Sequence, residues 1–173
     1  NKLGEMIKIG RRGSLTGKLT ILGVQGHVAY PQRANNPSTT LIKILDELKN
    51  IRFDKGTKNF QPSNLEVTKI NINNDADNVI PGQAEATFNV RYNDKHSSNS
   101  LKKKLNKIFN KISKKNKSKF KIQYRVSGEA FLTKPNTTTF MIQKIVKKIT
   151  KIKPKLSTTG GTSDARFIKN ISP

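Results

Sequence analysis

The chain has 173 residues, 33% of them hydrophobic, a formal net charge of +23 and no cysteine, so it can hold one domain, or a small domain and part of another. The absence of cysteine excludes disulfides and thiolate metal sites, and no apolar run is long enough for a membrane-spanning helix or the core of a signal peptide. We expect a cytoplasmic protein with no membrane partner.

Six segments between residues 13 and 126 show the periodicity of strands and helices. Residues 13–23 alternate small or polar residues with larger apolar ones, which predicts a half-buried strand. Asn36 and Pro37 are typical of a helix start, and an apolar stripe follows at helical spacing. The later elements are a strand over 64–73 with one slip in its alternation, a strand over 84–92, a helix capped by Ser97 or Ser98 with the apolar face Leu101, Leu105, Ile108 and Ile112, and a strand over 119–126.

The order strand–helix–strand–strand–helix–strand predicts an α+β fold, the ferredoxin-like βαββαβ sandwich, in which two helices cover one face of an antiparallel sheet. Beyond it we expect one more helix, a short strand over 155–158 and the Gly/Thr loop "STTGGTSD", which are typical of the edge of an α/β domain. We therefore interpret 13–126 as a whole domain inserted into an incomplete one, formed by 1–12 and 127–173, and the chain as a fragment.

The positive charge first suggests a polyanion partner. Only seven of the 34 basic residues are arginine, however, and arginine is the residue that phosphate and base-edge recognition favours. The lysines are spread over both helices and the loops instead of forming one stripe. We favour a solvated basic surface with no specific nucleic acid, and a polyanion partner stays as the alternative.

The residue types needed for a complete hydrolytic site are missing from the sequence. The two histidines, His27 and His96, are far apart in the chain, and no HxxE, HxD or paired-carboxylate pattern is present. A G-x-S-x-G nucleophile elbow and a P-loop are also absent. The visible residues therefore cannot form a hydrolase by themselves, and we interpret His96 as a surface loop residue.

His27, in "QGHVAYP", permits two interpretations. A loop imidazole that makes one backbone hydrogen bond is the structural one. In the functional one, the neutral imidazole donates its N–H to a developing oxyanion, which requires a single well-placed donor and no metal ligand. Gly26 would allow a close approach, and Tyr30 would stiffen the loop.

The other candidates are groups that bind anions. Asn78 follows an acidic turn, Arg91 ends an apolar strand, and either Arg11 or Arg12 can bind an anion while the other is solvated. The backbone N–H groups and hydroxyls of "STTGGTSD" can cradle a carboxylate. Each also has a plain structural interpretation, as a turn, an exposed strand end or a helix cap.

Taken in order, "IKIGRRGSLTGKLTILGVQGHVAYP", "NVIPG", "FNVRY", "SGEAFLT" and "LSTTGGTSDARFIK" resemble the zinc amidohydrolases that include acetylornithine deacetylases and aminoacylase-type carboxypeptidases. Within that family, they most resemble the bacterial succinyl-diaminopimelate desuccinylases, over essentially the whole chain. The resemblance implies a lid domain that forms a homodimer and is inserted into a zinc-binding catalytic domain. It also implies hydrolysis of N-succinyl-L,L-diaminopimelate to succinate and L,L-diaminopimelate, in lysine and peptidoglycan precursor synthesis.

The resemblance further implies a role for each candidate. His27 would reach into the active site of the partner subunit and stabilise the oxyanion. Two zinc ions would be held by residues outside this chain, so that the fragment alone is inactive. Substrate carboxylates and backbone would be bound by Arg11, Tyr30, Asn78, Arg91, Gly161 and Thr162.

Three alternatives stay open. One is a related deacylase that acts on acetylornithine or a peptide. Another is a basic ferredoxin-like module that binds RNA by stacking bases on Phe88, Tyr92, Phe120 and Tyr124. The last is a metal-free relative of the enzyme that is kept as a dimerisation partner.

Overall fold

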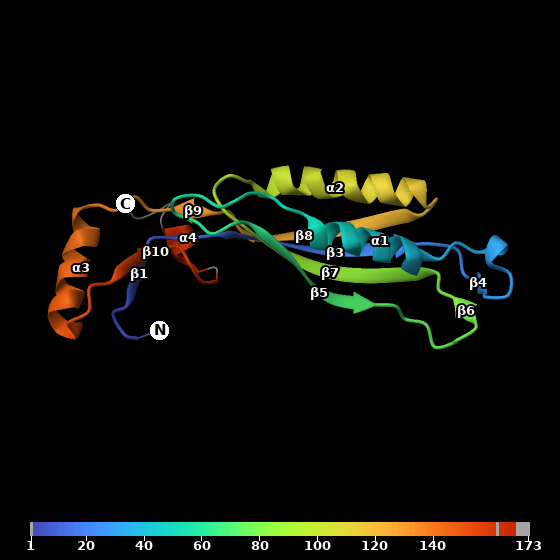
Figure 1. Ribbon diagram of the computed structural model, residues 1–173, viewed down its shortest axis with the longest axis horizontal. Coiled ribbons are helices and arrows are strands. Elements are labelled where there is room, and N and C mark those ends of the chain that lie inside the picture. The colour runs from blue at the N-terminus through green and yellow to red at the C-terminus, as the bar shows by residue number, and fades with distance from the viewer. Residues whose placement is uncertain (1, 162, 169–173) are drawn as a thin grey trace.

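The computed structural model describes residues 2–161 and 163–168 and has an elongated shape, with the long strands running along its length (Figure 1). Its described helices include none that is both long and apolar enough to cross a membrane.

Four antiparallel strands form the central sheet, in the order β5-β7-β3-β8. Both long helices lie on one face of this sheet (Figure 1). The predicted ferredoxin-like sandwich is therefore confirmed. The strands are β3 (Gly13–Leu22), β5 (Asn64–Asn71), β7 (Gln83–Tyr92) and β8 (Lys119–Gly128), and the helices are α1 (Pro37–Asn50) and α2 (Ser98–Lys115).

The predicted helix starts are also confirmed. The Asn36 side chain accepts a hydrogen bond from the Ser38 N–H at 2.9 Å, and Pro37 occupies the first helical position of α1. Ser97 caps α2 through a reciprocal pair of hydrogen bonds with Ser100. These caps satisfy N–H groups that the helix itself cannot pair.

The core lies between the helices and the sheet. Side chains pointing inward from β3 and β7 meet the apolar stripes of α1 and α2, and Phe109, which lay outside the expected stripe, is fully buried. The slip expected in β5 is a β-bulge between Val67 and Lys69, where an extra residue restores the inward direction of the apolar side chains.

Two glycines of β3 make room for aromatic rings of β7. A Cβ on Gly17 would lie 2.3 Å from the Phe88 ring, and one on Gly13 would lie 2.3 Å from the Tyr92 ring. Both rings are fully buried, so they cannot move aside without disturbing the core.

We expect Gly17→Ala to lower the free energy of unfolding by about 1–3 kcal/mol, because the added methyl overpacks the core. Chemical denaturation measures the change. The control is Gly82→Ala, where the nearest atom to the new Cβ lies at 3.8 Å. Equal stability of the two variants would contradict the packing argument.

One end of the molecule, called here the junction, gathers segments from both ends of the chain (Figure 1). β1 (Met6–Lys8) pairs in parallel with β10 (Lys155–Ser157), and β2 (Gly10–Arg11) pairs antiparallel with β9 (Phe131–Leu132). Here α3 (Thr137–Thr150) has no buried residue, and α4 (Ala165–Ile168) follows the Gly/Thr loop. The parallel pair with its adjoining helix matches the expected edge of an α/β layer.

The opposite end, called here the tip, carries two very short strands, β4 (Gly26–His27) and β6 (Val79–Ile80), which pair antiparallel. The 3-10 helix η1 (Pro31–Arg33) follows β4. The dipeptide Pro81–Gly82 predicts a type II turn, and this prediction is wrong, because that turn needs a positive φ that Gly82 does not have.

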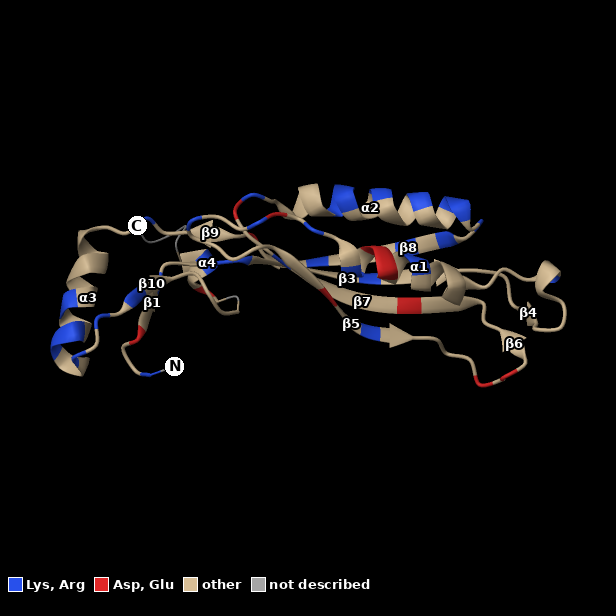
Figure 2. Cartoon of the chain, in the orientation of Figure 1, with Lys and Arg blue, Asp and Glu red and all other residues tan. Residues whose placement is uncertain are grey.

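The sheet aromatics cannot form a base-stacking platform on the open face. Phe88 and Tyr92 are fully buried, and Phe120 and Tyr124 pack against the same core under the helices. Lys and Arg residues are distributed over α2, α3 and the strands (Figure 2). The RNA-binding alternative loses its main structural argument.

Candidate functional site

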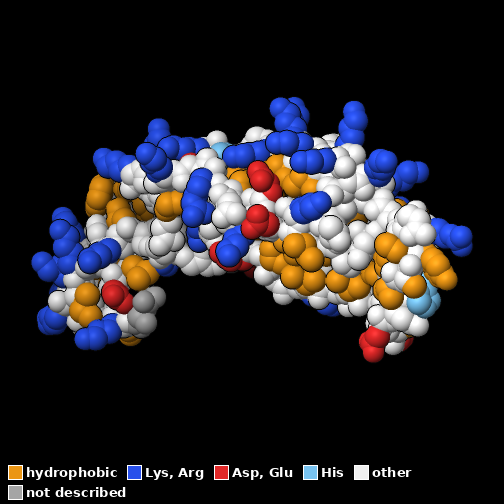
Figure 3. All heavy atoms as spheres, turned by 45° about the vertical axis from the view of Figure 1, so that its right-hand side comes forward, with side chains coloured by type: hydrophobic (Ala, Val, Ile, Leu, Met, Phe, Trp, Pro, Cys, Tyr) orange, Lys and Arg blue, Asp and Glu red, His pale blue; other side chains and the backbone are white. Residues whose placement is uncertain are grey.

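The tip brings together three of the predicted site residues. His27 and Asn78 lie on neighbouring segments, with the Asn78 amide nitrogen 3.4 Å from Nε2 of the imidazole. The Tyr30 ring centroid lies 6.0 Å from that of His27. All three side chains are exposed, and Figure 3 shows the histidine on the surface at this end of the molecule.

A backbone hydrogen bond decides which imidazole nitrogen of His27 can donate. The Ala29 N–H donates to Nδ1 at 3.0 Å, so in the neutral ring the proton lies on Nε2. The Asn78 amide, turned by half a rotation, would present its oxygen to this N–H. His27 therefore makes the one backbone hydrogen bond that the structural interpretation expects. Its Nε2–H stays exposed as a donor.

Arg33 belongs to the same tip, although the sequence analysis did not select it. Its guanidinium carbon lies 5.4 Å from the centroid of the Tyr30 ring, a cation–π contact. The available signal was its spacing of three residues from Tyr30 across Pro31, which fits one turn of a 3-10 helix. The contact restrains Tyr30 beside the histidine.

The junction holds the second set of predicted residues. The Arg11 guanidinium donates to the Thr159 carbonyl at 3.0 Å, while its Nε is buried with no hydrogen-bond partner in the described structure. Gly160 has a φ of +106° and Gly161 has open space around it. Thr162 lies outside the described residues. The Gly/Thr loop thus lies against Arg11, as a shared anion site requires.

The sequence allowed either Arg11 or Arg12 to be simply solvated, and Arg12 is not. Its guanidinium donates to the Pro62 carbonyl at 3.0 Å and to the Asn64 side chain at 2.9 Å. Burial, and then the positive charge of Arg91, lower the pKa of Arg12. Arg91 itself has a buried NH1 without a partner among the described residues. An anion would satisfy this donor and relieve the repulsion.

The two sets are far apart in one chain. Arg91 pairs with Ser14 at the start of β3, and the tip follows Leu22 at its end. From Ser14 to Leu22 the strand advances roughly 26 Å, at about 3.3 Å per residue. His27 and Arg91 of one protomer therefore cannot contact the same small molecule.

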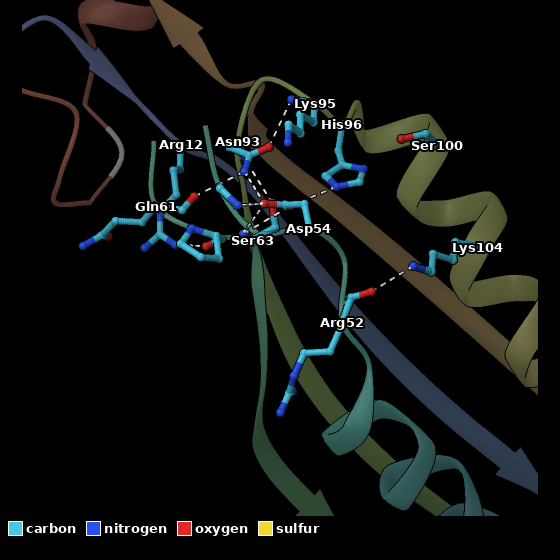
Figure 4. Close-up of polar contacts among 12 residues, drawn as sticks. Arg12, Arg52, Asp54, Gln61, Ser63, Asn93, Lys95, His96, Ser100 and Lys104 are labelled. Atoms are coloured by element: carbon cyan, nitrogen blue, oxygen red, sulfur yellow. Dashed lines mark hydrogen bonds and ion pairs between the residues drawn. The ribbon is translucent and has the colours of Figure 1, made fainter. Parts of the chain in front are cut away.

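A third polar cluster, centred on Asp54, lies between α1 and the end of β7 (Figure 4). The carboxylate accepts hydrogen bonds from the Gly56 N–H at 2.6 Å, the Asn93 side chain at 2.7 Å and the Ser63 N–H at 3.3 Å. His96 Nε2 lies 3.0 Å from it. The interpretation of His96 as a surface loop residue is wrong, since its side chain is only 19% exposed. The pattern Asp54-x-Gly56, typical of a turn closed by the aspartate side chain, was the sequence signal that could have identified this cluster.

Burial alone would raise the pKa of Asp54, but hydrogen bonds from Ser63, Gly56 and Asn93 outweigh it and lower the pKa to about 2. A depressed folded-state pKa adds stability above the unfolded value near 4, and this stability is lost as the pH falls towards 2. We expect the stability difference between the protein and Asp54→Asn to narrow by roughly 2 kcal/mol as the pH falls from about 5 to about 2. Denaturation at each pH measures it, and a constant difference would contradict it.

No group of three His, Cys, Asp or Glu side chains that could hold a metal ion occurs within residues 2–161 and 163–168. The side chains described do not fit a zinc centre, so no step of a reaction is derived through zinc.

The structure thus consists of an α+β sandwich joined to a short parallel strand pair, with its two sets of polar groups at opposite ends of the sandwich. The chain belongs to the Peptidase dimerisation domain family, whose profile matches residues 9–117.

Curated relatives agree with this assignment. The chain is 77% identical, over all of its length, to a succinyl-diaminopimelate desuccinylase of Pelagibacter ubique, of which it covers 45%. It is 50% identical, over 99% of its length, to one of Parvibaculum lavamentivorans, of which it covers 44%. The chain thus spans about half the length of the curated relatives it matches.

Solved structures share the fold at low sequence identity. A tripeptidase from Staphylococcus aureus superposes with a TM-score of 0.79 at 14% identity, over 99% of this chain and 44% of that one. An aminopeptidase from Bacillus cereus gives a TM-score of 0.77, also at 14% identity, with the same coverage. The arrangement of the sandwich and the junction is thus shared by both.

Proposed function

We propose that this chain is part of an amidohydrolase that converts N-succinyl-L,L-diaminopimelate to succinate and L,L-diaminopimelate. The high identity to two named desuccinylases supports this substrate. The separation of His27 from the junction is the observation that carries the mechanism, because it requires that a complete site contain groups from two protomers. We place the enzyme in the cytoplasm.

In this proposal residues 13–126 form the lid, and 1–12 with 127–173 belong to the catalytic domain. Two zinc ions, the number that the family resemblance implies, would be held by parts of the protein outside this chain, since the relatives are about twice as long. The chain's own groups bind and orient the substrate.

Each group has a distinct task. The Nε2–H of His27 donates to the amide oxygen as that oxygen gains negative charge, a stabilisation that is stronger in the transition state than in the substrate. Arg11 and Arg91 bind substrate carboxylates through donors that have no partner in the described structure. Asn78 and Tyr30 contact the substrate beside His27, and Gly161 and Thr162 contact its backbone or far end.

We further propose that a second copy of the chain pairs with the edge of the sheet at β5. A groove of about 820 Å³ lies between α1 and β5 and is lined by Ile42, Leu45, Leu65, Val67 and Ile70. Ile42 and Ile70 are 66% and 57% exposed. β5 is an edge strand, and apolar side chains are exposed in this region (Figure 3). A second copy would cover both the strand edge and the apolar side chains.

The test is hydrolysis of N-succinyl-L,L-diaminopimelate and of N-acetylornithine by a full-length protein that contains this chain, with zinc supplied. We expect clear preference for the succinyl substrate, because several basic donors match its several carboxylates. Preference for N-acetylornithine would favour the related deacylase instead. No turnover of either would favour the metal-free dimerisation partner.

A further inference from the structure

The loop between α1 and β5, residues 51–63, connects three parts of the molecule. Asp54 closes the loop on itself through Gly56 and Ser63, and fixes it to the segment after β7 through Asn93 and His96 (Figure 4). Asn93 adds two bonds, since its N–H donates to Ser63 Oγ at 3.0 Å and its side chain donates to the Gln61 carbonyl at 3.2 Å.

The same loop reaches both halves of the anion-binding junction. The Asn59 carbonyl accepts a hydrogen bond from the Thr158 hydroxyl, next to Thr159, which holds Arg11. At the other end of the loop, the Pro62 carbonyl and the adjacent Asn64 side chain hold Arg12. A displacement of this loop would therefore move the partners of both arginines.

Arg91 lies within this arrangement. Its backbone pairs with Asn64 in the β5–β7 register, and Asn93, two residues later, is tied to Asp54. The pairing fixes one side of Arg91 and the Asp54 cluster fixes the segment that follows it. The Arg91 side chain, whose buried NH1 has no partner among the described residues, therefore extends from a fixed backbone.

The negative charge of Asp54 is buried, and N–H donors and one histidine stabilise it. Its side chain is 5% exposed, and the ion pairs among the described residues give it no Lys or Arg partner. A buried carboxylate bound by several donors specifies one arrangement of those donors, because any other leaves a buried charge unsatisfied.

We infer that Asp54 is a positioning residue for substrate binding: it fixes loop 51–63 and the backbone on both sides of Arg91, so that the Arg91 side chain stays where a substrate carboxylate binds. This inference rests on the proposed role of Arg91, and it adds a residue that never contacts the substrate. Asp54 therefore affects substrate affinity and not the chemical step. His27 of the other protomer supports that step from its tip.

The experiment uses the full-length protein and compares Asp54→Asn with Asp94→Asn, which removes the same charge from an exposed position in the connection between β7 and α2. We expect Asp54→Asn to raise KM for N-succinyl-L,L-diaminopimelate about tenfold with kcat within about twofold, and Asp94→Asn to change neither. A purely structural role lowers the fraction of active enzyme, so that kcat falls while KM stays, and this result would overturn the inference.

A double-mutant cycle with Arg91→Met identifies the route. If Asp54 acts through Arg91, Asp54→Asn adds little to KM once Arg91 is gone, whereas additive effects would refute the inference. Ser63→Ala removes the hydroxyl that accepts from the Asn93 N–H and bonds to the Asp54 carboxylate, and it replaces Asp54→Asn in the cycle if that variant folds poorly. Should N-acetylornithine be the better substrate, the cycle is run with it: the proposed function then fails, and the inference is judged by the KM changes alone.

Discussion

Replacing His27 by alanine is expected to lower kcat for amide hydrolysis by about 100- to 1000-fold in the full-length protein, the loss typical of one oxyanion donor. The cause is loss of the Nε2–H, which the Ala29 backbone keeps on that nitrogen. KM should change little, because the bond forms as charge develops in the transition state. Steady-state kinetics on N-succinyl-L,L-diaminopimelate measures both constants.

His27→Gln is the matched control for this prediction. Its side-chain amide keeps an N–H donor at about the distance of Nε2 from the backbone, so we expect it to recover part of the lost kcat. A residue that only shapes the loop would tolerate alanine in this exposed position. Unchanged kcat in His27→Ala would therefore favour the structural interpretation, in which His27 only makes a backbone hydrogen bond.

The second large effect is expected when two impaired variants are mixed and assayed at a substrate concentration well below KM. In a dimer of His27→Ala with Arg91→Met, one site combines the intact Arg91 of the first chain with the intact His27 of the second. Random pairing makes half of the dimers mixed and each mixed dimer has one intact site, so activity should return to about a quarter of the wild-type value. The measurement is activity after the two proteins are unfolded together and refolded.

A mixture of His27→Ala with Asn78→Ala provides the control. Both residues lie at the tip, so no site in the mixed dimer receives an undamaged tip. This mixture should stay at the level of the single variants. Recovery in both mixtures, or in neither, would argue against a site shared between protomers.

Most of the fold could be predicted from the sequence because its signals are local. Alternation located the four long strands, and it located even the bulge of β5 as a slip before Ile70. Asn36 and Ser97 marked the helix starts. Phe109 was missed because the buried stripe of α2 follows steps of four residues, whereas the expected stripe turned towards Ile108.

The site was predicted less completely because its contacts join distant parts of the chain. Asp54 and His96 are 42 positions apart, and no local pattern connects them. The sequence also placed Arg11 and Arg12 side by side, without showing that one faces Thr159 and the other faces Asn64. In an extended backbone, neighbouring side chains point to opposite sides, so Arg11 and Arg12 contact two different segments.

The uninterrupted run of β3 has a consequence for which insertions and deletions this protein can accept. β3 is one ten-residue strand, paired along its whole length with β7, and the two strands together span the sheet from the junction to the tip. Their length therefore sets how far the histidine reaches. Removing two residues from each of β3 and β7 would keep every side chain on its face yet withdraw His27 by roughly 7 Å, beyond any hydrogen bond. The loops at either end can change where they carry no site residue, whereas the length of β3 and β7 sets the distance between the two sets of groups.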